Sequence, residues 1–169
     1  MLNKLDDDII PYFGENIKID RPSWDSIMMD IAKKVSERSH DSQTKCGAVI
    51  CNQDNEIIST GYNGFIRNID DSILPNTRPQ KYEFVIHGEC NSIVNCARQG
   101  KSTKGAIIYV TAMPCLRCLQ YIWQAGIVKV IYGNQQTNMQ QSEESKQKTD
   151  LILQLTGLEV EEYISENMQ

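Results

Sequence analysis

Two short segments decide the organisation of this chain: His87-Gly88-Glu89 and Pro114-Cys115-Leu116-Arg117-Cys118. The first begins a stretch with apolar residues at helical spacing, which predicts a helix over residues 87–98. The second follows a continuous apolar run over residues 106–111 that is typical of a buried strand. Pro114 favours a helix start. We therefore expect each segment at the N-terminus of a helix, with one strand between the two helices.

The residue types in these segments are those of a catalytic zinc site. Cys115 and Cys118 are three residues apart, so both sulfur atoms leave one face of a helix, where its positive N-terminus favours thiolates. His87 supplies a third ligand, which leaves the fourth position of the metal for water. Glu89 can approach that water without binding the metal, and we assign it the proton shuttle. The order H-x-E, then P-C-x-x-C, is the pattern of zinc deaminases that act on nucleobases.

Each half of the pattern has another interpretation when taken alone. A Cys-x-x-Cys pair is also a redox motif or half of a structural zinc site. A structural site needs a fourth protein ligand, and His40 or another cysteine would have to provide it. The whole chain could then be a non-catalytic, zinc-stabilised nucleotide sensor. The presence of Glu89 and Pro114 in the expected order favours the catalytic interpretation.

Composition limits the class of protein. The 169 residues suffice for one domain with a buried core, and we expect a single domain over 1–169. The net charge of −5, without a Lys/Arg cluster, disfavours a nucleic-acid partner. No apolar run approaches the roughly 20 residues of a membrane helix, and the first residues lack a signal peptide's apolar centre. We therefore expect a cytoplasmic protein, in the cytosol of its organism or of an infected host cell, that acts on a small molecule.

The cysteines divide into two groups. In a reducing compartment disulfides are not expected, and only Cys115 and Cys118 have the spacing of metal ligands. The other four are predicted to be small apolar side chains of the interior: Cys46, Cys51, Cys90 and Cys96.

Periodicity and turn residues predict the order of elements. Residues 1–22 look like an irregular lead-in, and Ser23 is a plausible N-cap for the first helix. Residues 65–86 look like a long functional loop. In the last helix we expect Leu151, Ile152 and Leu155 to face inward. Helices are expected over 24–38, 87–98, 115–125 and 142–156, and strands over 47–51, 56–60, 106–111, 127–132 and 158–164. This order predicts an α/β fold of three layers, α/β/α, with a central mixed five-stranded sheet.

Further segments outside the zinc motif resemble the deoxycytidylate (dCMP) deaminases of the cytidine deaminase superfamily. Gly61-Tyr62-Asn63-Gly64 and Gln124-Ala125-Gly126-Ile127 are more particular to the dCMP branch than the zinc motif is. The middle loop, with Asp70-Asp71 and Lys81-Tyr82, is similar to the animal-type loop and lacks the extra zinc ligands of many bacterial members. The resemblance covers roughly residues 22–133 and implies one catalytic Zn²⁺ per subunit.

The resemblance also implies an activity and roles for residues around the zinc. The reaction would be hydrolytic deamination of dCMP to dUMP with release of ammonia, which supplies dUMP for thymidylate synthesis. Arg38 would hold the 5′-phosphate, Asn63 the sugar and the Gly88 backbone the base. Another cytosine nucleotide such as dCTP stays open as an alternative substrate.

Many members of this family are regulated homohexamers, activated by dCTP and inhibited by dTTP with Mg²⁺. By resemblance, the regulatory site would involve Tyr62, Gly64 and Arg98. We therefore expect a homo-oligomer, with nucleotides as its small-molecule partners and neither nucleic acid nor a membrane among them.

Overall fold

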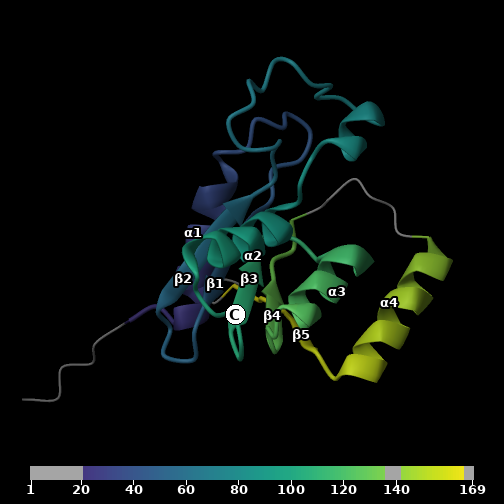
Figure 1. Ribbon diagram of the computed structural model, residues 1–169. Helices are drawn as coiled ribbons and strands as arrows, with labels where there is room; N and C mark the ends of the chain where they lie inside the picture. Colours follow the sequence, from purple (N-terminus) through teal and green to yellow (C-terminus); the bar gives the residue numbers. More distant parts are fainter. Residues whose placement is uncertain (1–20, 136–141, 166–169) are drawn as a thin grey trace, which may run out of the picture.

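The computed structural model describes residues 21–135 and 142–165 (Figure 1). Residues 1–20 of the predicted lead-in lie outside the described residues. Within the described ranges the elements are α1 (Trp24–Ser36), β1 (Gly47–Cys51), β2 (Ile57–Tyr62), the 3-10 helix η2 (Gln80–Glu83), α2 (Gly88–Gln99), β3 (Ile107–Val110), α3 (Leu116–Gln124), β4 (Lys129–Tyr132), α4 (Glu143–Thr156) and β5 (Glu159–Glu162).

Capping residues explain why the predicted helix boundaries are close to the observed ones. The side chain of Ser23 accepts a hydrogen bond from the backbone N–H of Ser26 and begins α1, as predicted. Ser142 begins α4 in the same way. Gly100 and Gly157 end α2 and α4 in the left-handed conformation, with φ of 66° and 71°, which glycine adopts without strain. The long loop differs from the prediction by containing η2.

The sheet has five strands in the order β2-β1-β3-β4-β5. Strand β1 is antiparallel to both β2 and β3, whereas β3, β4 and β5 run parallel. The sheet is therefore mixed, as the sequence predicted, because the hairpin precedes strands that are separated by helices.

Alternating side chains of the strands build two cores, one on each face of the sheet. On one face the strand residues contact α2, α3 and α4, through a cluster that includes Ile108, Leu119 and Val130. On the other face they contact α1, through Met28, Met29 and Tyr109. Figure 1 shows the sheet between these helices, with the loop over 65–86 beyond one end of it. The predicted three-layer α/β/α fold is confirmed.

The predicted inner face of α4 is wrong for two of its three residues. Leu151 and Leu155 are 52% and 72% exposed. Thr149 is buried instead, and Leu153 packs against the core. The helix has only four apolar residues, three of them consecutive, so several rotations about its axis fit the sequence, and docking against the sheet and α3 chooses between them.

Among the described residues, no helix is both long enough and apolar enough to cross a membrane.

Candidate active site

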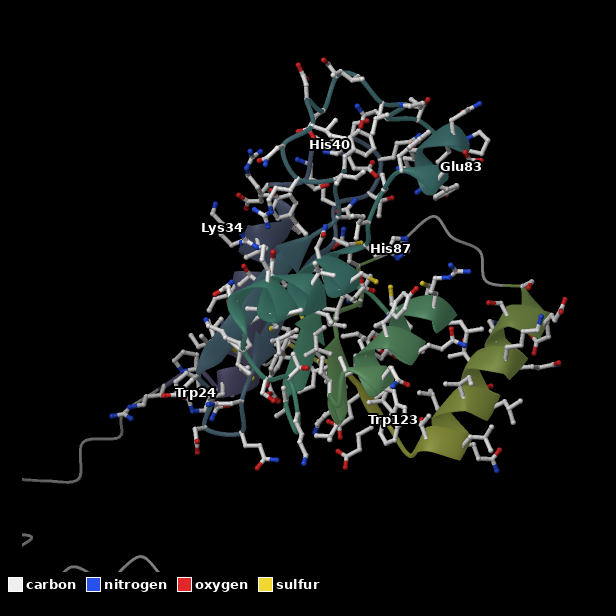
Figure 2. All side chains as sticks on the ribbon, in the orientation of Figure 1. Trp24, Lys34, His40, Glu83, His87 and Trp123 are labelled. Atoms are coloured by element: carbon white, nitrogen blue, oxygen red, sulfur yellow. The ribbon has the colours of Figure 1, made fainter. Side chains whose placement is uncertain are left out.

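The metal centre forms where the N-termini of α2 and α3 meet. His87 is the N-cap residue of α2 and Cys115 that of α3, and Cys118 lies in the first turn of α3. The Nδ1 atom of His87 is 3.7 Å from the Sγ atom of Cys115 and 3.4 Å from that of Cys118. A tetrahedral zinc ion with ordinary bond lengths places nitrogen and sulfur ligands about 3.6 Å apart. These three residues therefore fit a zinc ion, with Nδ1 as the histidine ligand. Figure 2 labels His87, which lies near sulfur atoms drawn in yellow.

The centre contains three protein ligands and no fourth among the described residues. The candidate ligand atoms of His87, Cys115 and Cys118 lie within 4.8 Å of one another, and neither Glu89 nor Cys90 belongs to this group. The Sγ atom of Cys90 is 3.8 Å from that of Cys118, so Cys90 lies next to one ligand without belonging to the group of three. Three ligands leave a position open for water, which is typical of a catalytic zinc site rather than a structural one.

The ligands influence one another's protonation. Hydrogen bonds from Cys118 and His87 lower the pKa of the Cys115 thiol to about 4, against the opposing effect of its burial. The pKa of His87 is raised to about 9, chiefly by its hydrogen bond to Cys115. A thiolate is thus favoured at Cys115, and a metal that binds here displaces protons shared among these groups.

Glu89 is the carboxyl group beside the centre. It lies in the first turn of α2, and its side chain is buried, with only 5% exposed. Burial raises its pKa, although hydrogen bonding to its own backbone and the charge of His87 oppose this shift. Such a carboxyl group can hold a proton nearer neutrality than an exposed one does, which suits a residue that takes up and returns protons.

A close contact between α2 and β2 holds Glu89 in this place. A Cβ atom added to Gly61 would come within 2.3 Å of the carbonyl oxygen of Gly88 and 2.4 Å of the backbone nitrogen of Ser92. Only glycine allows this approach. On the same turn, the side chain of Asn91 donates a hydrogen bond to the carbonyl oxygen of Tyr62 at 2.8 Å. The Gly-Tyr-Asn-Gly segment therefore positions the helix that carries the metal ligand and the acid.

A first cavity, defined by the residues around Glu89 and His87, opens onto this centre. Its cavity volume is about 80 Å³, and about 720 Å³ when the open solvent at its mouth is included. The walls come from the loop before β1, the end of β2, the loop over 65–86 and the segment before α3. The lining residues are Asp41, Thr44, Cys46, Asn63, Arg78, Lys81, Tyr82, Val85, His87, Glu89, Val110, Ala112, Met113 and Cys115.

A buried ion pair holds two of these loops together. The Nζ atom of Lys81 donates to Oδ2 of Asp41 at 2.6 Å, and both side chains are 3% exposed. Asp41 also accepts hydrogen bonds from the backbone N–H groups of Gln43 and Thr44, at 2.8 and 3.0 Å. Burial alone would raise the pKa of Asp41, but these hydrogen bonds and the charge of Lys81 hold it below its usual range. The pair fixes the loop over 65–86 against the loop before β1.

Asn63 lines the first cavity, and its amide also braces the loop before β1. Its Oδ1 atom accepts from the backbone N–H of Cys46 at 2.7 Å, and its Nδ2 atom donates to the carbonyl oxygen of Thr44 at 2.8 Å. Gly88 lies against the loop, where an added Cβ atom would be 3.1 Å from the carbonyl oxygen of Cys46. Asn63 thus lies in the wall of the first cavity, and Gly88 packs behind it against the backbone of Cys46 and Asn63.

The remaining sequence-predicted residues lie in a second cavity, which is defined here by its three arginines: Arg38, Arg67 and Arg98. Tyr62 and Gly64 also line it. The structure therefore places Arg38 beside the predicted regulatory residues and not among the residues that line the first cavity. The two cavities are neighbours along the chain, because Tyr62 lines the second and Asn63 the first.

Sequence reasoning missed several residues of the first cavity. Arg78 and Lys81 were assigned no role. Both lie in the long loop directly before the metal motif, and Lys81 belongs to the part of that loop that resembles the animal-type members. The prediction for the four other cysteines holds for Cys51 and Cys96, which are buried. It is wrong for Cys46 and Cys90, which are partly exposed, since one lines the cavity and the other adjoins Cys118.

Fold and site together define the class as an α/β/α protein with a three-ligand zinc site and a buried acid. Comparison with known proteins agrees: residues 22–134 match the cytidine and deoxycytidylate deaminase zinc-binding region. The chain belongs to this family.

Several deoxycytidylate deaminases are similar in sequence over about two thirds of this chain. The deoxycytidylate deaminase of Homo sapiens is 36% identical over 115 residues, which is 64% of this chain and 64% of that protein. The probable deoxycytidylate deaminase of Drosophila melanogaster is 35% identical over 120 residues, 64% of this chain and 58% of that protein. The matched part of the chain thus spans less than two thirds of these relatives.

A solved structure with similar architecture is that of dCMP deaminase from the cyanophage S-TIM5, in complex with dCMP and dUMP. It is 29% identical to this chain, with a TM-score of 0.67, and the match covers 86% of this chain and 100% of that one.

Proposed function

We propose that the protein is an enzyme that deaminates dCMP hydrolytically to dUMP and ammonia. The observation that carries this proposal is that the buried acid Glu89 lines the same cavity as the metal ligands His87 and Cys115. A proton shuttle and a water-activating metal at one cavity are the two parts that hydrolytic deamination of a cytosine ring requires.

The chain's own residues account for the proton transfers. His87, Cys115 and Cys118 would hold Zn²⁺, which when bound lowers the pKa of a water molecule and so supplies hydroxide at neutral pH. Glu89 would accept a proton from water and deliver it to the ring nitrogen of cytosine as hydroxide adds at C4. The carboxylate would then take the proton of that new hydroxyl group and pass it to the amino group, so that the C4–N bond breaks and ammonia leaves. The raised pKa of Glu89 suits both directions of transfer.

The relatives' substrate supports dCMP as the substrate here. Known deoxycytidylate deaminases are similar to the chain both in sequence and in structure. The net charge of −5 argues against a nucleic-acid substrate. Deamination of another cytosine nucleotide, such as dCTP, is the second candidate, because the first cavity is open at its mouth.

The second cavity supports a regulatory site of the kind the resemblance implies, with dCTP as activator and dTTP as inhibitor, each bound with Mg²⁺. Its three arginines suit the phosphates of a nucleotide. Tyr62, Gly64 and Arg98 keep their proposed regulatory roles. The backbone of Gly64 exchanges two hydrogen bonds with that of Ile86, at 2.8 and 3.1 Å, and His87 follows directly. A nucleotide that displaces Gly64 would therefore also shift Ile86 and, through the next peptide bond, the metal ligand His87.

A homohexamer and a cytosolic location remain predictions. Val94 and Tyr121, on α2 and α3, are 59% and 50% exposed and line one groove beside the metal centre. Such an exposed apolar groove is compatible with contact between subunits.

The experiment is ammonia release from dCMP by the zinc-loaded protein, with Glu89→Gln as the matched control. We expect turnover by the wild type and a loss of about 10³- to 10⁴-fold in kcat for Glu89→Gln, with unchanged zinc content. Addition of dCTP or dTTP with Mg²⁺ should raise or lower the wild-type rate. Turnover of dCTP but not of dCMP would select the second candidate. No turnover of any cytosine compound by a protein with bound zinc would indicate a non-catalytic sensor.

A further inference from the structure

We propose that Arg78, and not Arg38, binds the 5′-phosphate of the substrate in the first cavity. This inference rests on the proposed function, because it assigns one part of the substrate to one side chain. It differs from the expectation by resemblance, which gave the phosphate to Arg38.

The position of Arg78 in the first cavity is the first reason for this assignment. It is the one arginine that lines the cavity shared by Glu89 and His87, as far as the described residues show. Arg38 lines the second cavity, on the other side of the Tyr62–Asn63 peptide. Because Glu89 and Arg78 line the same cavity, a nucleotide whose base reaches Glu89 could contact Arg78 with its phosphate without leaving that cavity.

The hydrogen bonding of Arg78 carries the second step. Its Nη2 atom donates to Oγ1 of Thr44 at 2.7 Å, which holds the guanidinium in place. Its Nε atom is buried and makes no hydrogen bond within the described structure. A buried donor without a partner costs free energy, and a bound acceptor would relieve that cost. The Nε–H and the second N–H of Nη2 lie on one edge of the guanidinium, which is the edge that binds a phosphate with two hydrogen bonds.

The charge balance of the cavity carries the third step. Lys81 is the other cationic side chain of the loop over 65–86 that lines the cavity, but its charge is matched by Asp41 at 2.6 Å. No carboxylate of a described residue lies within 4.0 Å of Arg78 in an ion pair. Away from the metal centre with His87 and Glu89, the charged side chains that line the cavity are therefore one matched pair and Arg78, whose charge a bound phosphate would balance.

The buried pair also explains how Arg78 is positioned. Asp41 accepts from the backbone N–H of Thr44, and Thr44 in turn accepts from Arg78. Lys81 anchors the loop that carries Arg78 to the same carboxylate. Lys81 and Asp41 are thus positioning residues, and Arg78 is the group that contacts the ligand.

The test compares a nucleotide with its nucleoside. Zinc-loaded wild type, Arg78→Gln and Arg38→Gln are titrated calorimetrically with dUMP and with deoxyuridine, and kcat/KM is measured for dCMP and deoxycytidine. Arg78→Gln should weaken dUMP binding and lower kcat/KM for dCMP on the order of 10- to 100-fold, mainly through KM. Binding of deoxyuridine and turnover of deoxycytidine should change little. Arg78→Lys should recover part of the loss, because it keeps the charge but not the fork of donors.

Three results would overturn the inference. The first is that Arg78→Gln binds dUMP as tightly as the wild type does. The second is that Arg78→Gln weakens binding of dUMP and of deoxyuridine equally, as loss of a merely structural residue would. The third is that Arg38→Gln, and not Arg78→Gln, selectively weakens binding of dUMP. Failure of the proposed function gives a different pattern. Wild type that is active on dCTP but not on dCMP would change the substrate, and the same comparison with dCTP and deoxycytidine would then test Arg78. Wild type that deaminates no cytosine compound would overturn both.

Discussion

The two cavities of this protein differ in how their charges are balanced. In the first, Lys81 and Asp41 are almost completely buried and matched at 2.6 Å, and hydrogen bonds hold the carboxylate from two further sides. In the second, Arg38, Arg67 and Arg98 have no carboxylate in an ion pair among the residues described, and the pair present there is that of His40 with the half-exposed Asp71. This difference suits the proposed roles of the two cavities, which are substrate binding in the first and reversible binding of a phosphate-bearing effector in the second.

The largest effect is expected at the metal centre, which borders the first cavity. Cys118→Ser should abolish stable zinc binding and with it the deamination of dCMP, because only two strong ligands remain. Cys90→Ser is the matched control, since Cys90 adjoins Cys118 at 3.8 Å but does not belong to the three-ligand group. Zinc content by atomic absorption measures both variants. Loss of zinc from Cys90→Ser would show that the site has four protein ligands and would remove the open position.

The next largest effect tests whether the first cavity depends on its buried ion pair. Asp41→Asn leaves Lys81 buried without its counter-charge, which should lower the free energy of unfolding by about 3–5 kcal/mol at pH 7. Asp30→Asn is the control, because Asp30 and Lys33 form an exposed pair at 3.1 Å that should contribute less than about 1 kcal/mol. Urea unfolding measures both. An equal loss of unfolding free energy from the two substitutions would mean that the buried pair contributes no more to stability than the exposed one.

The pH dependence of the same pair has a definite sign. The pKa of Asp41 is lower in the folded protein than its ordinary value of 3.8, so folding is stabilised above that value and the stabilisation is lost as pH falls through the folded pKa. The difference in unfolding free energy between wild type and Asp41→Asn should therefore be constant from pH 7 to about 5 and shrink below about 4. A difference that grows on acidification would mean that the carboxyl group is protonated in the folded protein.

A smaller effect is expected in the second cavity. Arg98→Gln should leave the dCMP rate without effectors nearly unchanged and weaken the response to dCTP and dTTP on the order of 5- to 100-fold in effector concentration. Arg117→Gln is a matched control, because Arg117 is also on a helix near the metal centre but does not line the second cavity. Rates across an effector titration measure the change. A loss of dCMP turnover without any effector would instead connect Arg98 to the substrate.

The smallest effect is that of salt, which distinguishes exposed charges from buried ones. Between about 0.05 and 0.3 M NaCl we expect the activating concentration of dCTP to rise several-fold, because the arginines of the second cavity are screened. The KM for dCMP should rise less, because the guanidinium of Arg78 is fixed by Thr44 and its Nε atom is buried. Equal salt dependence of both constants would contradict the proposed difference.

The sequence alone determined the order of elements, the mixed sheet and the metal ligands. These features depend on short-range rules: serine and glycine caps, apolar periodicity, and two cysteines one helical turn apart. His87 and Cys115 are distant in sequence, but each begins a helix, and adjacent helices on one sheet bring their N-termini together. The family's motif could therefore be recognised without coordinates.

Only the tertiary structure decided the rest. The rotation of α4, which exposes Leu155, depends on docking, because its apolar residues do not define a single face. The path of the loop over 65–86 brings Lys81 to Asp41, 40 residues earlier in the chain, and Arg78 to Thr44, 34 residues earlier. Arg38 lines the second cavity and not the first. No local pattern encodes these contacts, since they form between irregular segments whose meeting depends on the whole fold.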